Sequence, residues 1–300
     1  MNEADFIARL RTLPLHPGAH GLRDDAAIVG DMVVTTDTLV EGVHFLPTDP
    51  PADVAWKLVA TNLSDLAAKG ALVEGVLLNH PLTDAAWDAA FLDGLAAVLG
   101  AFRCPLIGGD TVSLPTGAPR VLTVTAFGVG AIAPARTGAR AGDALWVTGT
   151  IGDAGAGLAI ARAGQGDATL LARYRRPVPR LSEGRLLAPV VHAMMDVSDG
   201  LLIDADRMAG ASGLAVTLDL ATVPLSPAYR AVAGADRTAR LAAATAGDDY
   251  ELLFAAAPDR EPPVAATRIG AFAEGRGLAL HDAGEPLALP ARLGFEHGLI

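Results

Sequence analysis

Apolar runs and segments with helical spacing alternate along the first half of the chain. Runs of β-branched and other apolar residues predict strands at residues 32–36, 72–78, 105–109 and 120–130. Apolar residues three and four positions apart predict helices at residues 3–13, 53–69 and 85–101. Pro14 and Gly70 follow the first two of these helices, as is typical of helix ends.

The second half shows the same alternation after a polar stretch. Strands are predicted at residues 144–148, 194–197, 214–218 and 251–256, and helices at residues 154–163, 168–174, 181–189, 201–211 and 238–244. Short strands separated by Gly and Pro turns are expected beyond them. The stretch 136–143 (RTGARAGD) is rich in Gly and Arg and is the predicted linker. We therefore predict α-helices mixed with β-strands in two domains, residues 1–136 and 137–300.

Composition limits the class of protein. The 300 residues are 51% hydrophobic and 19% charged, which can support two folded cores and argues against disorder. The net charge of −11 and the absence of a basic block argue against nucleic acid as a partner. The single cysteine, Cys104, excludes an intrachain disulfide. No signal peptide is recognised, and we expect no apolar run to approach the roughly 18 residues of a membrane span, so we expect a cytoplasmic protein.

Lysine occurs only at Lys57 and Lys69. Neither lies in the Gly-Lys-Ser/Thr context of a P-loop, and the His-Arg-Asp signature of protein kinases is absent. If the chain handles nucleotides, it must hold their phosphates in another way.

Aspartates account for 25 of the 34 acidic residues. Most of the aspartates that we consider candidate site residues fall at predicted strand ends or loop starts. The six sites that we expect to converge are Asp25, Asp37, Asp65, Asp110, Asp196 and Asp199. Convergent carboxylates repel one another unless a cation neutralises them. Oxygen ligands without Cys or His favour Mg²⁺ or Mn²⁺ over Zn²⁺, and such ions commonly bridge substrate phosphates.

Two glycine turns, at residues 108–109 and 149–152, could approach an anion closely. A plain tight turn without a ligand is at least as good an interpretation of the second. Arg136 and Arg140 could contact phosphate oxygens or remain solvated in the linker. The residues alone therefore indicate Mg²⁺-dependent phosphoryl or nucleotide chemistry without a P-loop.

Eight ordered motifs go further than this. They are DDAAIV, TTDTLVEGVHF, NLSDLAAKGA, LIGGDT, ARTGARAGD, VTGTIGDAGAGL, DVSDGL and GDDYEL, with an echo at LGFEH. In this order they resemble the thiamine-monophosphate kinase family of the aminoimidazole-ribonucleotide synthetase-like superfamily. The resemblance implies a two-domain fold of mixed sheets with flanking helices, in which the first domain binds ATP and Mg²⁺ and dimerises. The second domain would complete the active-site cleft.

The resemblance also implies an activity and a set of site residues. ATP would phosphorylate thiamine monophosphate, with several Mg²⁺ ions assisting and no single residue acting as catalytic base. The implied Mg²⁺ ligands are Asp25, Thr35, Thr36, Asp37, Asp65, Asp110, Asp196 and Asp199. The implied ATP contacts are Gly109, Asp110, Arg136 and Ser198, and the implied thiamine phosphate contacts are His44, Asp248 and Phe295.

This chain departs from the family pattern at two positions. Arg23 stands where the family has the second glycine of Gly-Ile-Gly-Asp-Asp, and Asp248 replaces a glutamate. Two alternative functions remain open at this point. One is another ATP-dependent synthetase of the superfamily, acting on an aminoimidazole ribonucleotide or a selenium substrate. The other is a nucleotide-binding paralogue without catalytic activity.

Overall fold

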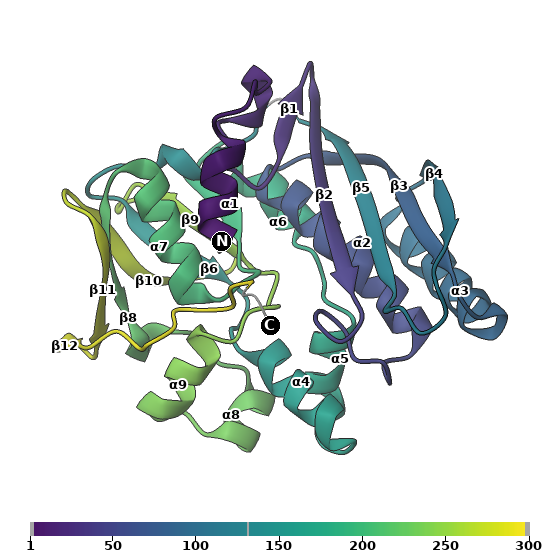
Figure 1. The fold of residues 1–300 in the computed structure, drawn as a ribbon. Helices are drawn as coiled ribbons and strands as arrows, with labels where there is room; N and C mark the ends of the chain where they lie inside the picture. Colours follow the sequence, from purple (N-terminus) through teal and green to yellow (C-terminus); the bar gives the residue numbers. More distant parts are fainter. Residues whose placement is uncertain (1–2, 131, 298–300) are drawn as a thin grey trace.

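Two β-sheets with packed helices form the chain in the computed structural model, which describes residues 3–130 and 132–297 (Figure 1). The first sheet has five strands in the order β1 (Ala27–Val29), β2 (Met32–Val40), β5 (Val121–Val129), β3 (Leu72–Leu82) and β4 (Leu106–Ser113). Only the β3–β4 pair in this sheet is parallel.

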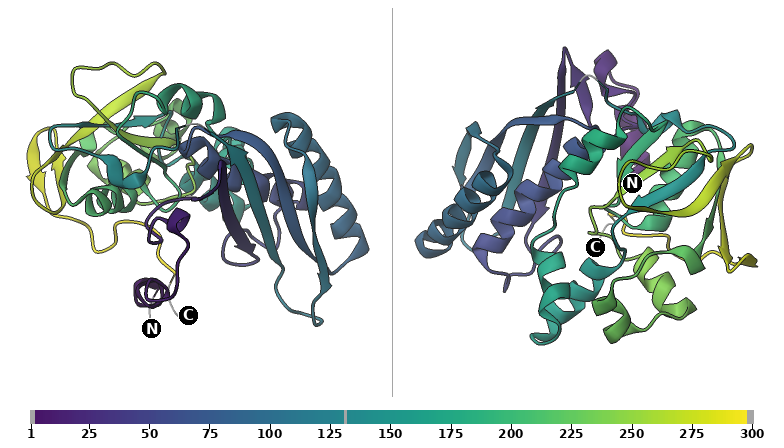
Figure 2. Two further views of the ribbon diagram at one scale, coloured as in Figure 1. Left: turned by 90° about the horizontal axis from the view of Figure 1, so that it is seen from above. Right: turned by 180° about the vertical axis from the view of Figure 1, so that it is seen from behind.

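Helices α2 (Pro51–Ala68) and α3 (Ala85–Phe102) cover one face of this sheet (Figure 2). The alternation of β5 reflects this, because Leu122 and Val124 are buried while Thr123 and Thr125 are turned to the opposite face. We call that opposite side the open face, because none of the described helices packs on it. Short helix α1 (Glu3–Leu10) precedes the sheet.

The second sheet has seven strands, ordered β12 (Glu285–Leu287), β11 (Gly277–Asp282), β8 (Ala215–Asp219), β10 (Ala266–Ala273), β6 (Ala144–Thr148), β9 (Leu252–Ala256) and β7 (Ala193–Asp196). Its helices are α4 (Asp153–Ala163), α5 (Ala168–Arg175), α6 (Leu181–Leu187), α7 (Leu201–Ser212), α8 (Pro227–Ala233) and α9 (Arg237–Ala244). Each sheet has its own apolar core. The proposed boundary at residue 136 falls between the two sheets and stays a prediction.

Helix α2 joins the two sheets. Thirteen of its 18 residues are buried, because its other side meets α6 and β7 of the second half. Ala67 and Ala68 pack there with Met194, Leu252 and Phe254 in a third apolar cluster. The C-terminal end of α2 therefore lies at the junction of the two halves.

The predicted elements were largely confirmed, and the strand at 144–148 was predicted to the residue. Besides short 3-10 turns, one strand and one α-helix were missed. Strand β1 has only three residues, too few for a period to appear. Helix α8 begins with Pro227 after a Ser226 cap, a signal that was present but short. The predicted linker is partly packed, because Ala139 and Asp143 are buried and Asp143 accepts a hydrogen bond from Arg140 N–H, whereas Arg140 itself is exposed.

Helix α3 is long and apolar enough to cross a membrane by length and composition, and 22% of it is buried. The expectation that no segment reaches this length and composition was therefore too strict. In this structure α3 packs against α2, with Phe91, Leu95 and Val98 buried in the apolar core of the first half.

Cys104 provides a test of the first core. The side chain is 1% exposed, and burial raises the pKa of its thiol to about 11. Because the thiolate is the reactive form, we expect the folded protein to resist a thiol reagent such as DTNB at pH 8. The same protein in guanidinium chloride should react rapidly with one equivalent. Rapid reaction of the folded protein would contradict the described packing.

Candidate active site

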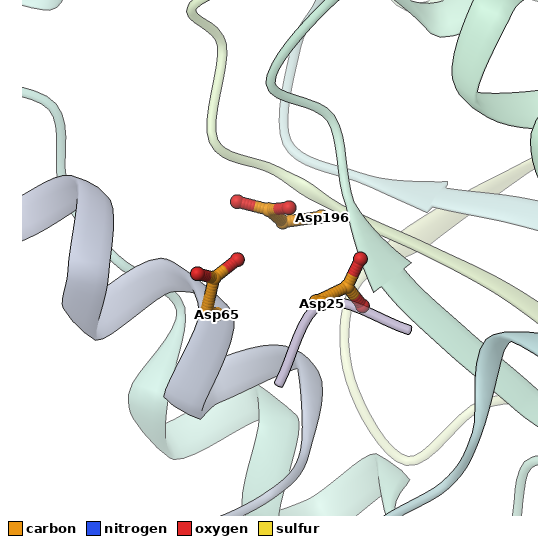
Figure 3. Close-up of side chains that lie close together, drawn as sticks. All are labelled: Asp25, Asp65 and Asp196. Carbon is orange, nitrogen blue, oxygen red and sulfur yellow. The ribbon is translucent and has the colours of Figure 1, made fainter. Parts of the chain in front are cut away.

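Three aspartates from distant parts of the chain meet at the junction of the two halves (Figure 3). Asp25 precedes β1, Asp65 lies on α2, and Asp196 ends β7. One carboxylate oxygen of each lies within 4.8 Å of the other two. We call these three residues the aspartate cluster. Such a set of hard oxygen donors fits a divalent cation of the Mg²⁺ type.

The electrostatics of the cluster are those of like charges removed from water. Burial, together with the charges of neighbouring aspartates, raises the pKa of Asp65 and of Asp196 well above the usual value of an aspartate. Asp37 of β2 lies nearby, and burial with the charges of Asp199 and Asp25 raises its pKa to about 6. A cation bound here would relieve this repulsion.

Asp25 behaves differently because two cations face it. Burial alone would raise the pKa of Asp25, but the charges of Lys69 and Arg136 lower it to about 2. Lys69 Nζ lies 2.8 Å from Asp25 Oδ2, and the Arg136 guanidinium contacts Oδ1. Asp25 Oδ2 is buried and has no hydrogen-bond partner among the described residues. Apart from its ion pair with Lys69, this oxygen can still accept a metal.

Polar side chains in the buried part of the first half hold the cluster in place. The Thr35 hydroxyl contacts Asp65 Oδ2 and donates to the backbone oxygen of Asp25 at 3.2 Å. Ser64 Oγ donates to Asp196 Oδ2 at 2.6 Å. Asn62 Oδ1 accepts the Asp37 N–H at 3.0 Å. These contacts connect β2 and α2 with β7.

The loop between β7 and α7, residues 197–200, carries two further predicted residues, Ser198 and Asp199. Asp204 is fully buried in the first turn of α7 and accepts the N–H groups of Asp199 and Gly200 at 3.1 and 3.2 Å. Burial and the charge of Asp199 raise the pKa of Asp204 to about 7. Arg207 contacts both Asp199 and Asp204. The conformation of the loop is therefore held by side chains of the helix that follows it.

His44 and Asp248 also come together, through Lys57 of α2. Lys57 Nζ donates to the backbone oxygen of His44 at 3.1 Å and to Asp248 Oδ2 at 2.7 Å. It also lies 4.3 Å from the centre of the Tyr174 ring. Asp248 Oδ1 accepts a hydrogen bond from the Tyr250 hydroxyl at 3.0 Å. Both carboxylate oxygens of Asp248 are thus held.

Backbone contacts connect this second group with the loop. Asp248 N–H donates to Ser198 O at 2.7 Å, and Phe295 N–H donates to Asp199 O at 2.8 Å. The Phe295 ring is 42% exposed and packs edge-on against His297, whose ring lies 5.3 Å from that of His44. Burial lowers the pKa of His44, whose Nδ1 accepts the Val40 N–H at 3.0 Å. The neutral ring of His44 therefore carries its proton on Nε2.

Thr36 and Asp110 are not brought to the cluster within the chain. The Thr36 hydroxyl donates to Val124 O on β5, and the residue belongs to the open face of the sheet, opposite to Thr35 and Asp37. Asp110 lies on the exposed edge strand β4, where it pairs with Asn79 of β3. Strand β4 is three strand spacings, or about 14 Å, away from β2. Gly109 has a packing reason of its own, because a Cβ there would lie 1.9 Å from Leu78 O.

The glycine turn at residues 149–152 is already filled by a carboxylate of the chain itself. Asp249 accepts the Gly152 N–H at 2.8 Å and lies 3.5 Å from the Ala154 N at the start of α4. The reading of this segment as a tight turn therefore agrees with the structure. A phosphate could reach these N–H groups only by displacing Asp249.

Sequence reasoning missed Lys57, Asn62, Ser64 and Lys69 as site residues. All four lie in or directly after α2 and are at most 2% exposed. A signal was present, because these polar residues interrupt a helix without a polar face, and a helix that is apolar all round is expected to be buried. Polar side chains inside such a helix need partners, which here are the aspartates and the backbone that surround the site.

Comparisons with known proteins identify the family of this chain. The models of the AIR synthase related protein family match residues 23–132 (N-terminal domain) and 140–295 (C-terminal domain). The thiamine-monophosphate kinase of Caulobacter vibrioides is 40% identical, covering 99% of this chain and 91% of that protein. The Escherichia coli K12 enzyme of the same name is 39% identical over 78% of this chain and 75% of that protein.

Solved structures give the same result. The structure of AaThiL complexed with AMPPCP and TMP superposes with a TM-score of 0.88 at 27% identity, covering 99% of this chain and 97% of that one. The thiamine-monophosphate kinase of Stenotrophomonas maltophilia gives 0.77 at 39% identity, covering 94% and 96%. The chain therefore belongs to the thiamine-monophosphate kinase family, an enzyme family within the AIR synthase related proteins.

Proposed function

We propose that this chain transfers the γ-phosphoryl group of ATP to thiamine monophosphate, forming thiamine diphosphate and ADP in the last step of thiamine diphosphate synthesis. The aspartate cluster carries the proposal, since one carboxylate oxygen from each of a buried and two half-buried aspartates lies within 4.8 Å of the other two. A related structure of this family is described with AMPPCP and TMP, which supports ATP and thiamine monophosphate as the substrates. We place the reaction in the cytoplasm.

The cluster fits Mg²⁺, and the fit does not depend on the relatives. Every donor is a carboxylate oxygen, and Asp25 Oδ2 is a buried oxygen that no hydrogen bond satisfies. We propose that Asp25, Asp65 and Asp196 hold Mg²⁺ together with Asp37, Asp199 and Thr35. When bound, several Mg²⁺ ions would neutralise phosphate charge and stabilise the transferred group.

The proposed transfer is direct and in line, without a catalytic base. A phosphate monoester is largely dianionic at pH 7, because its second pKa is about 6, so the acceptor oxygen has no proton to lose. The chain must instead orient two anionic groups and exclude water. We propose that Arg136, Ser198, Gly109 and Asp110 contact ATP. His44, Asp248 and Phe295 would then contact thiamine monophosphate at the other end of the residue 197–200 loop.

One assay separates the proposed function from its alternatives. The purified protein is incubated with ATP, Mg²⁺ and thiamine monophosphate, and the products are identified by chromatography. Thiamine diphosphate together with ADP supports the proposal. ADP formation only with another acceptor would indicate a different ATP-dependent synthetase of the superfamily. Nucleotide binding without turnover would indicate a non-catalytic paralogue.

Asp65→Asn tests the cluster. The substitution keeps the shape of the side chain and removes one of three converging charges, so we expect kcat to fall on the order of 100-fold or more. Without metal the variant should unfold at a higher temperature than wild type, because repulsion among buried carboxylates decreases.

Asp93→Asn on the exposed side of α3 is the matched control and should change neither quantity. Wild-type turnover in Asp65→Asn would refute the assignment of this residue.

Asp248→Asn tests the substrate end. Both oxygens of Asp248 are held, by Lys57 and by Tyr250, so the residue is fixed where it lies. If it contacts thiamine monophosphate, the variant should raise the KM for thiamine monophosphate by about tenfold. The KM for ATP should change much less. An equal rise in both KM values would argue against a substrate contact by Asp248.

We also propose that the chain forms a homodimer through the open face of the first sheet. No described helix covers this face, and edge strand β4 exposes Val112 at 51%. Half-buried apolar residues of β5 and β3, Phe127, Val129 and Leu77, lie on the same side. Thr36 and Asp110 would then lie at the interface between protomers.

Val112→Lys should therefore produce monomers in sedimentation velocity experiments, because a lysine would be buried without a partner. Leu92→Lys is the control, since Leu92 is 58% exposed on α3, on the other side of the sheet. It should remain dimeric. A monomeric wild type, or a dimeric Val112→Lys protein, would contradict this interface.

A further inference from the structure

Both lysines of the chain are buried, and one of them lies against the proposed metal site. Lys57 and Lys69 are each 2% exposed, and each is paired with aspartate. They differ in their neighbours. Lys57 faces Asp248 and His44, whereas Lys69 faces Asp24 and Asp25. A buried ammonium is costly, so its placement needs an explanation in terms of what surrounds it.

The three N–H donors of Lys69 are all engaged. They bond to Asp24 Oδ1 and to the backbone oxygens of Pro134 and Met194, the last two at 3.2 Å. Asp25 Oδ2 lies 2.8 Å from Nζ but receives no hydrogen bond. Lys69 therefore compensates the charge of Asp25 through an ion pair, while its N–H groups are directed at the other three oxygens. The oxygen that it faces keeps its lone pairs for another cation.

The same contacts fix the position of Asp25. Asp24 Oδ1 accepts the Asp25 N–H at 3.0 Å, so the lysine that holds Asp24 also holds the backbone of Asp25. Pro134 lies in the segment that leaves the first half, and Met194 lies in β7 of the second half. Lys69 thus connects the loop bearing Asp25 with the strand that ends at Asp196.

We propose that Lys69 is a fixed internal cation of the metal centre. Its single positive charge neutralises part of the negative charge of Asp24 and Asp25, which a bound divalent cation would otherwise have to neutralise. Asp25 Oδ2 remains a metal ligand. In this role the positive charge of Lys69 stabilises the metal-free centre and lowers the affinity of the centre for divalent cations. The inference rests on the proposed function, because it requires the aspartate cluster to bind metal.

Mn²⁺ alone is the probe, measured by the electron paramagnetic resonance signal of the free ion and by the Mn²⁺-dependent shift in unfolding temperature. Neither readout requires turnover. Lys69→Met keeps the length of the side chain and removes its charge. Because a unit positive charge near the site is lost, Lys69→Met should bind Mn²⁺ at least about tenfold more tightly than wild type. Its metal-free form should unfold at a lower temperature, and its Mn²⁺-dependent shift should be larger.

Lys57→Met is the matched control, since it removes the chain's other lysine, which is equally buried. It should lose stability while keeping the wild-type Mn²⁺ affinity. If Lys69→Met does not fold, Lys69→Gln carries the same expectation, because it keeps a donor for Asp24 without the charge. Unchanged or weaker Mn²⁺ binding by the Lys69 variant, with normal binding by wild type, would overturn this inference alone. Absence of Mn²⁺ binding by wild type would instead overturn the proposed metal site together with it.

Discussion

The burial of like charges at the junction of two halves is the constraint on which the site depends. Asp25, Asp65 and Asp196 come from different segments of the chain. Their three carboxylates could not be ionised side by side, away from water, without positive charge nearby. Lys69 and Arg136 supply two such charges, both directed at Asp25. Asp65 and Asp196 receive hydrogen bonds but no ion pair among the described residues. A divalent cation bound between Asp65 and Asp196 would therefore supply the positive charge that these two carboxylates lack.

Helix α2 makes this arrangement possible because it belongs to both halves. It covers the first sheet on one side and packs on α6 and β7 on the other. Its apolar residues, such as Ala67 and Ala68, hold the halves together by close packing. The polar residues in and after the helix face the aspartates. Packing and charge compensation are thus provided by one segment, and a shift of the helix would disturb both.

The features that could be predicted from the sequence are those whose signals lie within one short segment of the chain. Asp25 in a loop and Asp196 at a strand end lie together as their positions in the sequence suggested, whereas Asp37, expected at a strand end, lies inside β2. Thr36 illustrates the limit, because a strand alternates with a period of two and neighbouring residues in one motif face opposite sides of the sheet. Partners distant in sequence, such as Lys69 with Asp24, could not be predicted, since only the folded arrangement brings them together. The filling of the turn at 149–152 by Asp249 was hidden for the same reason.

The loop between β7 and α7 couples the two ends of the site. Asp196 on one side belongs to the aspartate cluster, and Ser198 O on the other accepts the Asp248 N–H. Asp204 holds the N–H groups between them from beneath. A phosphoryl transfer without a catalytic base depends on the relative position of two anionic substrates more than on any single proton. A loop held at both ends and by Asp204 provides such a position. The metal and the acceptor would then both be positioned by the same short segment of backbone.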